Sequence, residues 1–371
     1  MSTTAQQAAK LVGFGFAETT VTQDVKSLLA RGLSTCFLFK RNIETAVQFS
    51  HLLRDLKKAA PAGVLTCIDQ EGGRVQRLRE PLTVIPPMRA LGLTKDPQLA
   101  EQVARVMARE LRQLNIDFDA APVMDVDTNP ANPVIGTRSL GPDPANVAAL
   151  GTAMIRGFQA EGIAACAKHF PGHGDTSQDS HTDLPRLRHS MERLEAVELP
   201  PFKAAVDAGV SAIMSAHVIF EPLDSKYPAT MSRPALDGIL RDRFNFPGVV
   251  FSDDLEMKAI ADHYALEECL VRGLNAGIDV FIVCHHLEIQ HKAVDLITAA
   301  VEKGHVSQAR FNQAIGRVDK LLATYAHAPI QEPDESIFGC AAHQRVIDQV
   351  KQAVGQAALA VGKDPTEVLG Y

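Results

Sequence analysis

The most unusual segment of this sequence is residues 167–185, which read AKHFPGHGDTSQDSHTDLP and directly follow an apolar run. Histidines and aspartates are concentrated there among glycines and prolines. The side chains able to do chemistry are His169, His173, His181, Asp175, Asp179 and Asp183. Imidazoles and carboxylates at this density are typical of a metal site, a proton-transfer site or a polar surface loop. The residue types alone leave all three open, so the spacing has to distinguish them.

A metal site would draw first on His169 and His173, which are four residues apart. In a helix this spacing places two imidazoles on one face. Pro171, Gly172 and Gly174 interrupt the interval and disfavour a helix. The glutamate that accompanies the two histidines in a helical HExxH zinc site is also absent. We therefore expect no metal ion here, and a site built by loop geometry stays the alternative.

Proton transfer would use Asp179 and His181, which are two residues apart. In an extended or turn segment a carboxylate at this spacing can bond one imidazole nitrogen, which fixes the tautomer and raises the basicity of the other nitrogen. Retaining glycoside hydrolysis usually employs two carboxyl groups about 5–5.5 Å apart. A histidine can replace one of these carboxyl groups as acid/base because its pKa lies near neutral pH. The other carboxyl group, the nucleophile, could then be Asp253. A loop histidine held by a structural aspartate is the alternative that spacing leaves open.

The elements that must position these residues alternate between short apolar runs and longer amphipathic stretches. Helical patterns cover about 43–60, 97–115, 145–161, 195–208 and 258–276. Strands are expected at about 12–16, 35–40, 63–69, 117–126, 163–170, 210–218, 248–254 and 278–284. Eight strand–helix units predict an α/β fold, a (β/α)8 barrel of the TIM type that need not be regular. An open doubly wound sheet is the competitor, but no GxGxxG follows the first strand.

The domain organisation expected from this pattern is a single catalytic barrel domain over residues 1–371. Its core covers about 10–325 and includes a helical pattern near 307–325. Residues 326–371 form a C-terminal helical extension packed on the barrel, with helical pattern near 340–361. No internal repeat, low-complexity segment or interdomain linker is visible in the sequence. One domain is therefore the simplest organisation.

Polar residues gather where each predicted strand ends. In a barrel of this kind catalytic groups project from the carboxyl ends of the strands and from the loops that follow. Besides the segment 167–185, the residues at these ends are Asp69, Glu71, Arg74 and Arg77, then Asp125, Asp127 and Arg138, then His217, then Asp253 and Asp254, and finally Cys284, His285 and His286. Two independent patterns, the strand order and the polar clusters, thus predict an enzyme with its active site at one end of the barrel.

The bulk composition excludes some partners. A formal net charge of -7 over 371 residues argues against nucleic acid or an anionic membrane, since both require basic patches. The N-terminal residues lack a basic start followed by an apolar core, and no run is long enough to cross a bilayer. Six scattered cysteines without CxxC pairs are typical of reduced, mostly buried thiols. We expect a cytoplasmic protein.

Four motifs in consistent order, KHFPGHGDTSQDSH, DQEGGRVQRL, NPVIGTRSLGPDP and FSDDLEM, resemble those of bacterial β-N-acetylhexosaminidases of glycoside hydrolase family 3. The nearest likeness is to the cytoplasmic single-domain enzymes of peptidoglycan recycling, and it extends over roughly residues 10–325. KHF alone would be weak, because β-glucosidases of the same family carry it. The continuation PGHGDT…DSH indicates the N-acetylglucosaminidase branch.

The resemblance implies a role for each matching residue. Asp253 would be the nucleophile that forms a glycosyl-aspartyl intermediate, and His181 the general acid/base with Asp179 as its partner. No cofactor is implied, because the covalent mechanism is complete without one. The expected substrate is a muropeptide, GlcNAc–anhydro-MurNAc–peptide, or another GlcNAc-containing glycoside. The residues implied to bind the sugar ring are Asp69, Arg77, Arg138, Lys168 and His169.

Several residues and functions stay undecided at this point. Successive strand residues face opposite ways, so only one of Asp253 and Asp254 is expected to face the barrel interior. His217 and Met257 each have a pocket-lining and a packing interpretation, and the adjacent histidines in CHHL should diverge rather than share a metal. The alternative functions are a phosphorylase or β-glucosidase of the same family, a metal-dependent barrel hydrolase, and a non-catalytic sugar-binding protein.

Overall fold

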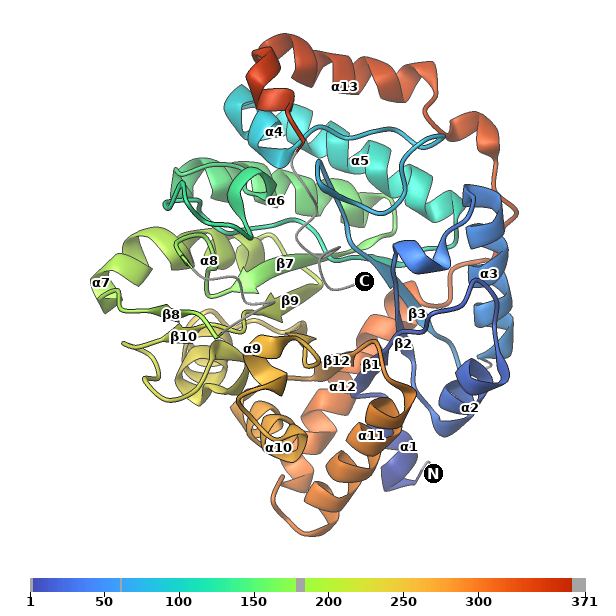
Figure 1. Ribbon diagram of the computed structural model, residues 1–371, viewed down its shortest axis with the longest axis vertical. Coiled ribbons are helices and arrows are strands. Elements are labelled where there is room, and N and C mark those ends of the chain that lie inside the picture. The colour runs from blue at the N-terminus through green and yellow to red at the C-terminus, as the bar shows by residue number, and fades with distance from the viewer. Residues whose placement is uncertain (1–2, 61, 178–183, 362–371) are drawn as a thin grey trace.

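The barrel predicted from the strand count is present. The computed structural model describes residues 3–60, 62–177 and 184–361; Asp179 and His181 lie outside these ranges. Eight parallel strands close in the order β1-β12-β11-β9-β7-β6-β3-β2 (Figure 1). Their bounds are β1 Val12–Phe14, β2 Thr35–Leu38, β3 Leu65–Ile68, β6 Phe118–Asp119, β7 Ala164–Phe170, β9 Ala212–Ser215, β11 Val249–Asp254 and β12 Val280–Val283. The α/β barrel prediction is confirmed.

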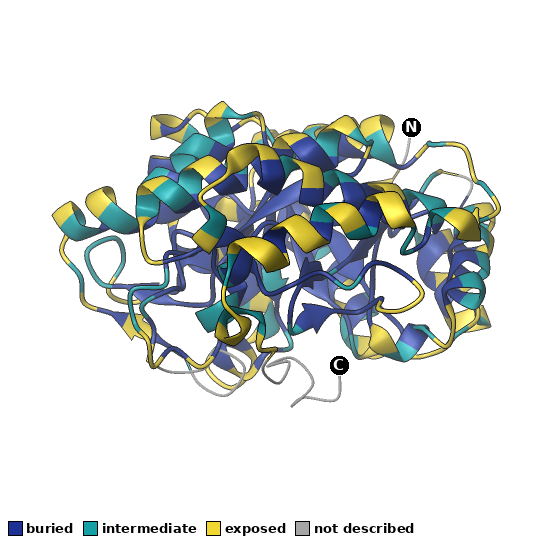
Figure 2. Cartoon of the chain, turned by 90° about the horizontal axis from the view of Figure 1, so that it is seen from above, coloured by how far each residue is buried: buried dark blue, intermediate teal, exposed yellow. Residues whose placement is uncertain are grey.

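Helices surround the strands, and in Figure 2 their outward faces are exposed while the strands beneath them are buried. Within the described ranges, no helix has the length and apolar character needed to cross a membrane. The α-helices are α1 Thr4–Ala9, α2 Gln23–Arg31, α3 Ala46–Ala59, α4 Met88–Thr94, α5 Pro97–Gln113, α6 Pro144–Ala160, α7 Met191–Arg193, α8 Leu199–Asp207, α9 Lys258–Ala261, α10 Leu266–Ala276, α11 Leu287–Glu302, α12 Gln308–Tyr325 and α13 Ala341–Ala353.

Phenylalanine rings fill the inside of the barrel. Phe37 on β2 lies 6.1 Å, centroid to centroid, from both Phe118 on β6 and Phe251 on β11, and the last two are 5.2 Å apart. These three strands are not neighbours in the barrel, so their side chains can only meet across its interior. Edge-to-face and tilted rings of this kind pack a lumen without leaving a pore. The barrel is therefore solid below its mouth.

Most predicted strands are a few residues shorter than the sequence pattern indicates, and two predicted elements differ more. The fourth strand was expected over 117–126, but only Phe118–Asp119 keep regular pairing. Beyond them Pro122 has no N–H to donate to a neighbouring strand, so the segment follows β7 through single contacts such as the amide of Met124 to the carbonyl of Lys168, 2.6 Å. The helix expected over 258–276 is broken into α9 and α10 by the residues 262–265.

Small elements at the carboxyl ends of the strands prepare the site. After β3 the chain forms a two-stranded antiparallel hairpin, β4 Gln70–Gly72 and β5 Val75–Gln76. A single 3₁₀ turn, Gly136–Arg138, ends the long loop that follows β6. A second small sheet pairs β8 Arg186–Leu187 with β10 Ile219–Phe220. The hairpin and the 3₁₀ turn carry charged residues that line the cavity at this end of the barrel.

The C-terminal helix α13 packs against α4 and α5 (Figure 1). A buried pair anchors it, because Nδ1 of His343 lies 2.8 Å from Oε1 of Glu110 on α5. The same oxygen accepts from the amide of Gly339 at 2.9 Å and the hydroxyl of Thr83 at 2.6 Å. One buried carboxylate thus connects three segments. The organisation of the whole chain as a single domain stays a prediction.

At the amino-terminal end of the barrel, carboxylates are buried among cations. Asp279, just before β12, is fully buried and accepts from Arg241 at 2.6 Å, Arg310 at 2.9 Å and Arg317 at 3.2 Å. Burial lowers the pKa of Arg241 to about 10 despite the attraction of Asp279. Buried charges of this kind are compatible with a stable fold only when each has a partner of opposite charge. They belong to the stability of the fold, since they lie at the end opposite the predicted site.

Replacing Asp279 by Asn should cost about 3–5 kcal/mol of unfolding free energy, because three guanidinium groups lose the charge they share. The matched control is Asp319→Asn, which removes a surface ion pair with Lys10 and should cost about 0–1 kcal/mol. Urea denaturation of the three proteins measures both values. A loss for Asp279→Asn no larger than that for Asp319→Asn would contradict the argument.

Candidate active site

A cavity opens at the carboxyl ends of the strands, where the sequence predicts the site. Six of the eight predicted site residues line it together: Asp69, Arg77, Arg138, Lys168, His169 and Asp253. They come from the ends of β3, β7 and β11 and from the two loops described above. The other two, Asp179 and His181, lie outside the described residues. The strand-end rule therefore locates the side chains that the structure describes.

Lys168 is the centre of a buried charge cluster in this cavity. Its Nζ lies 2.7 Å from Oδ1 of Asp69 and 2.7 Å from Oε1 of Glu71. Burial alone would lower the pKa of this amine, but the charges of Asp69 and Glu71 outweigh burial and raise it. Lys168 is therefore a cation held in place by two carboxylates, and it cannot serve as a neutral base near pH 7.

Glu71 joins Lys168 to Arg138. Both of its oxygens accept from the Arg138 guanidinium, at 2.7 and 2.8 Å, in the bidentate arrangement favoured by arginine and carboxylate. Burial by itself would raise the pKa of Glu71, yet Arg138 and Lys168 together hold it well below its usual range. Glu71 follows the end of a predicted strand, but its sequence position alone assigns it no role. Nothing in the local sequence shows its pairing, which depends on the loop after β6.

Asp69 is the part of this cluster that faces the opening. Its side chain is 19% exposed, against 3% for Lys168. Lys168 holds Oδ1, and Arg77 approaches Oδ2 at 3.5 Å. Burial would raise the pKa of Asp69, and the charges of Lys168 and Arg77 lower it. An ionised, partly exposed carboxylate between two cations can accept hydrogen bonds from hydroxyl groups of a ligand.

Asp125 orients both histidines of the KHFPGH segment. Its Oδ1 accepts the amides of His169 at 3.1 Å and His173 at 2.7 Å, and its Oδ2 lies 2.7 Å from Nδ1 of His169. Since a carboxylate accepts, Nδ1 of His169 carries a proton and donates it to Asp125. Burial and the neighbouring His169 lower the pKa of His173 to about 4, so His173 is neutral at pH 7. Asp125 was not predicted as a site residue.

The glycine in PGHG explains how this loop reaches the cavity wall. A Cβ on Gly174 would lie 1.9 Å from the carbonyl oxygen of Val126. Only glycine allows the loop after β7 to pack against the loop after β6 at this distance. Asn132 then donates to the carbonyl of His173 at 2.9 Å. The loop is held by close backbone packing, and the described part contains no helix on which His169 and His173 would share a face.

Asp253 and Asp254 both line the cavity, which contradicts the expectation that only one of them faces inward. The pairing of β11 with β12 shifts register between Phe251 and Asp254, and such a bulge breaks strict alternation. Asp253 is half-buried, and its Oδ1 accepts the amide of Asp254 at 2.9 Å. The carboxylate of Asp254 is engaged elsewhere, so the two side chains have different environments.

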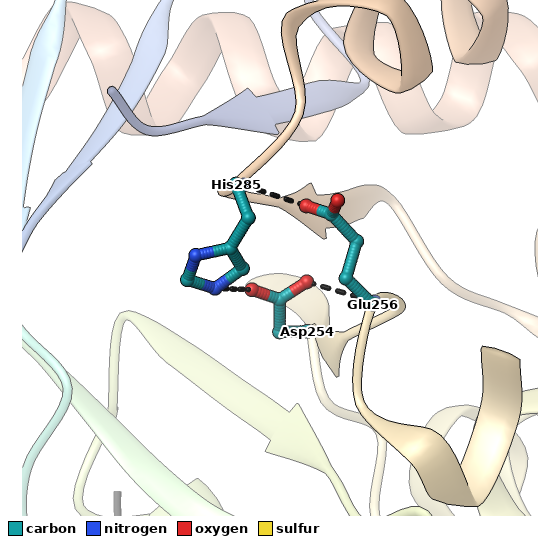
Figure 3. Close-up of side chains that lie close together, drawn as sticks. All are labelled: Asp254, Glu256 and His285. Carbon is teal, nitrogen blue, oxygen red and sulfur yellow. Dashed lines mark hydrogen bonds and ion pairs between the residues drawn. The ribbon is translucent and has the colours of Figure 1, made fainter. Parts of the chain in front are cut away.

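The Asp254 network consists of Asp254, Glu256 and His285 (Figure 3). Nε2 of His285 lies 3.0 Å from Oδ2 of Asp254, and the amide of Glu256 donates to Oδ1 of Asp254 at 3.0 Å. Oε2 of Glu256 accepts the amide of His285 at 2.6 Å. One ligand atom from each of the three lies within 4.8 Å of the others. Burial and the charge of Asp254 raise the pKa of Glu256.

The remaining undecided residues also have definite places. His217 is fully buried behind the network, with Nε2 3.0 Å from the carbonyl oxygen of Asp254 and Nδ1 2.8 Å from the hydroxyl of Thr230. It therefore supports the backbone rather than lining the cavity. Met257 is 3% exposed and lines the cavity, so it has both of its expected roles. The adjacent histidines diverge as expected: His285 turns to the cavity and His286 is exposed.

Comparison with known proteins gives one consistent family. The model of the glycosyl hydrolase family 3 N-terminal domain matches residues 6–321. A beta-hexosaminidase of Thiobacillus denitrificans is 40% identical over 298 residues, 79% of this chain and 80% of that protein. A family 3 beta-N-acetylglucosaminidase structure from Paenibacillus has a TM-score of 0.91 at 38% identity, covering 95% of this chain and 69% of that one. NagZ from Neisseria gonorrhoeae, in complex with N-trifluoroacetyl-D-glucosamine, has a TM-score of 0.76 at 31% identity. The match covers 93% of this chain and 98% of that one.

Replacing Glu71 by Gln should destabilise the protein by about 3–5 kcal/mol at pH 7, because Arg138 and Lys168 stay buried without their shared carboxylate. The pKa of Glu71 is lower in the folded than in the unfolded chain, so its contribution is complete above about pH 4.3, the unfolded value, and is lost below it. The stability difference between the two proteins should therefore shrink below that pH. Urea titrations at pH 7, 4 and 3 test this, with the exposed Glu80→Gln as control. A difference that grows towards pH 3 would contradict it.

Proposed function

Because this chain belongs to glycosyl hydrolase family 3, we propose that it is a retaining exo-β-N-acetylglucosaminidase that acts through a glycosyl-aspartyl intermediate on Asp253. The observation that carries the proposal is the joint position of Asp253 and the Lys168 charge cluster in one cavity at the mouth of the barrel. Asp253 offers a nucleophile, and the Lys168 charge cluster offers fixed donors and acceptors for sugar hydroxyls. That the protein is an enzyme, a glycosidase, follows from the family.

Sugar binding is assigned to Asp69, Arg77, Arg138, Lys168 and His169. Asp69 accepts from ring hydroxyls, Lys168 and Arg77 donate to them, and Nε2 of His169 can accept from or donate to them. Because Glu71 already holds Lys168 and Arg138, and Asp125 already holds His169, binding needs little rearrangement of these three side chains. A single terminal sugar ring is the ligand that we propose for this site.

The chemistry is a double displacement. The carboxylate of Asp253 attacks the anomeric carbon, the bond to the leaving oxygen breaks, and His181 gives its proton to that oxygen. Water then attacks the same carbon and gives a proton to His181, which releases GlcNAc and restores Asp253. Asp179 would orient the imidazole of His181. An imidazolium as acid becomes a neutral imidazole when it gives up its proton, so no second carboxylate stands beside Asp253, whose pKa such a neighbour would raise.

The substrate we propose is a GlcNAc-terminated muropeptide, GlcNAc–anhydro-MurNAc–peptide, in cytoplasmic peptidoglycan recycling. The support is the likeness to NagZ, whose solved complex holds a GlcNAc analogue. No cofactor enters the mechanism. A β-N-acetylglucosaminide phosphorylase and a β-glucosidase of the same family are the competing functions, followed by a metal-dependent barrel hydrolase.

The protein should release 4-nitrophenol from its β-N-acetylglucosaminide in preference to the β-glucoside, with no dependence on EDTA or added phosphate. Asp253→Ala should lower turnover to background, because the covalent intermediate cannot form. Preference for the glucoside would transfer the protein to the β-glucosidase branch. Activity that rises with phosphate would indicate a phosphorylase, and loss of activity in EDTA would indicate a metal-dependent enzyme.

His181→Ala should lower kcat/KM by about 10²–10⁴-fold for substrates with poor leaving groups, which need protonation of the leaving oxygen. Activated leaving groups such as 4-nitrophenol need little protonation, so their first step should be affected far less. Comparing 4-nitrophenyl and alkyl N-acetylglucosaminides measures the difference. Equal losses for both substrates would remove His181 from the proton-transfer role.

A further inference from the structure

Asp254 is held from three sides, and one of its contacts is to Asp253. Its carboxylate receives Nε2 of His285 at 3.0 Å and the amide of Glu256 at 3.0 Å (Figure 3). Its carbonyl lies 3.0 Å from Nε2 of His217, and its own amide donates to Oδ1 of Asp253 at 2.9 Å. The side chain, the carbonyl and the amide of Asp254 are thus all engaged, and the position of its amide determines where one oxygen of Asp253 lies. A shift of Asp254 would move the carboxylate that we propose as nucleophile.

Arg41 determines which nitrogen of His285 carries the proton. NH1 of Arg41 lies 3.2 Å from Nδ1 of His285. A guanidinium group only donates, so Nδ1 must accept and the ring proton resides on Nε2, directed at Asp254. Two more bonds hold Arg41, from Nε to the carbonyl of Phe16 at 2.9 Å and from NH2 to the carbonyl of Cys284 at 2.9 Å. The tautomer of His285 thus depends on an arginine tied to the backbone on two sides.

The same hydrogen bonds argue against a metal ion in the Asp254 network, although its three ligand atoms are close enough to share one. A metal on Nε2 of His285 would displace the proton there and require one on Nδ1, facing the Arg41 guanidinium. The oxygens of Glu256 are also engaged, one by the amide of His285 at 2.6 Å and the other by Nδ1 of His286 at 2.5 Å. The network has the directionality of a hydrogen-bond relay.

A relay at this place has a clear purpose. Two adjacent carboxylates that face one site repel each other. The N–H of His285 and the amide of Glu256 compensate the charge of Asp254 and keep its oxygens directed at them. Asp253 is the carboxylate that we propose for the reaction. A misplacement of about 1 Å in such a group can lower the rate about 100-fold.

We propose that Arg41 and His285 are positioning residues that act through Asp254 to aim the carboxylate of Asp253. This inference rests on the proposed role of Asp253 as nucleophile. Arg41 fixes the tautomer of His285, His285 fixes the side chain of Asp254, and the amide of Asp254 fixes an oxygen of Asp253. Neither positioning residue takes part in bond making or breaking.

Kinetics of three variants test the relay with 4-nitrophenyl β-N-acetylglucosaminide. His285→Leu removes the N–H to Asp254 and should lower kcat about 10- to 100-fold with little change in KM. In His285→Gln the side-chain amide can place an N–H near the position of Nε2, so this variant should recover most of the activity. The control is His291→Leu. His291 lies on α11 and is also paired with an arginine, since its Nδ1 is 3.0 Å from NH1 of Arg31, and its replacement should leave the kinetics as in the wild type.

The imidazole ¹⁵N spectrum provides a second, direct measurement on the wild-type protein. The His285 ring, assigned by its absence from His285→Gln, should be protonated on Nε2. A proton on Nδ1 would overturn the relay, because Arg41 could then not donate to that nitrogen. Zn²⁺ that inhibits the wild type but not His285→Gln would also overturn it and assign the network as a metal site.

The kinetic outcomes separate this inference from the proposed function. Normal kcat in His285→Leu beside an inactive Asp253→Ala variant would overturn the relay alone. A large rise in KM with kcat unchanged would also overturn it, since His285 would then act as a substrate contact. Asp253→Ala with full activity would overturn the proposed function and the relay together.

Discussion

The mouth of this barrel depends on one buried interaction, the sharing of Glu71 between Lys168 and Arg138. All three side chains are at most 4% exposed, and an isolated charge at that depth costs several kcal/mol. They arrive from β7, from the hairpin after β3 and from the 3₁₀ turn after β6. Burying the charged residue of one segment without the other two would leave its charge uncompensated. The three segments must therefore pack together. The shape of the cavity follows from this requirement.

The same interaction also fixes the side chains of the proposed binding site before a ligand arrives. Lys168 and Arg138 are directed by Glu71, and His169 by Asp125, before any ligand enters. Donors that are already fixed lose little entropy on binding and need no reorganisation as charge develops in the reaction. The partly exposed Asp69 is the member of the cluster that a ligand can reach. Residues without substrate contact therefore determine how well those with contact perform.

Much of this arrangement is readable from the sequence, for physical reasons. Strands buried on both faces must be apolar runs, which gave the eight strands, and a parallel barrel places all their carboxyl ends at one mouth. Six predicted site residues accordingly meet in one cavity. The roles of Glu71 and Asp125 were not readable, because each is defined by a partner on another loop. The bulge that turns both Asp253 and Asp254 inward depends on the register with β12, which no local pattern encodes.

Aspartates at the two ends of the barrel show how one residue type serves stability or chemistry. Asp279 at the amino-terminal end is 0% exposed, and three arginines and a backbone amide saturate its oxygens. Asp69 at the carboxyl end has two cations and an exposed edge. A saturated carboxylate has no acceptor capacity left for a ligand, whereas a partly exposed one can exchange water for a hydroxyl at little cost. Burial and the number of donors, rather than residue type, therefore separate the structural from the functional acids of this fold.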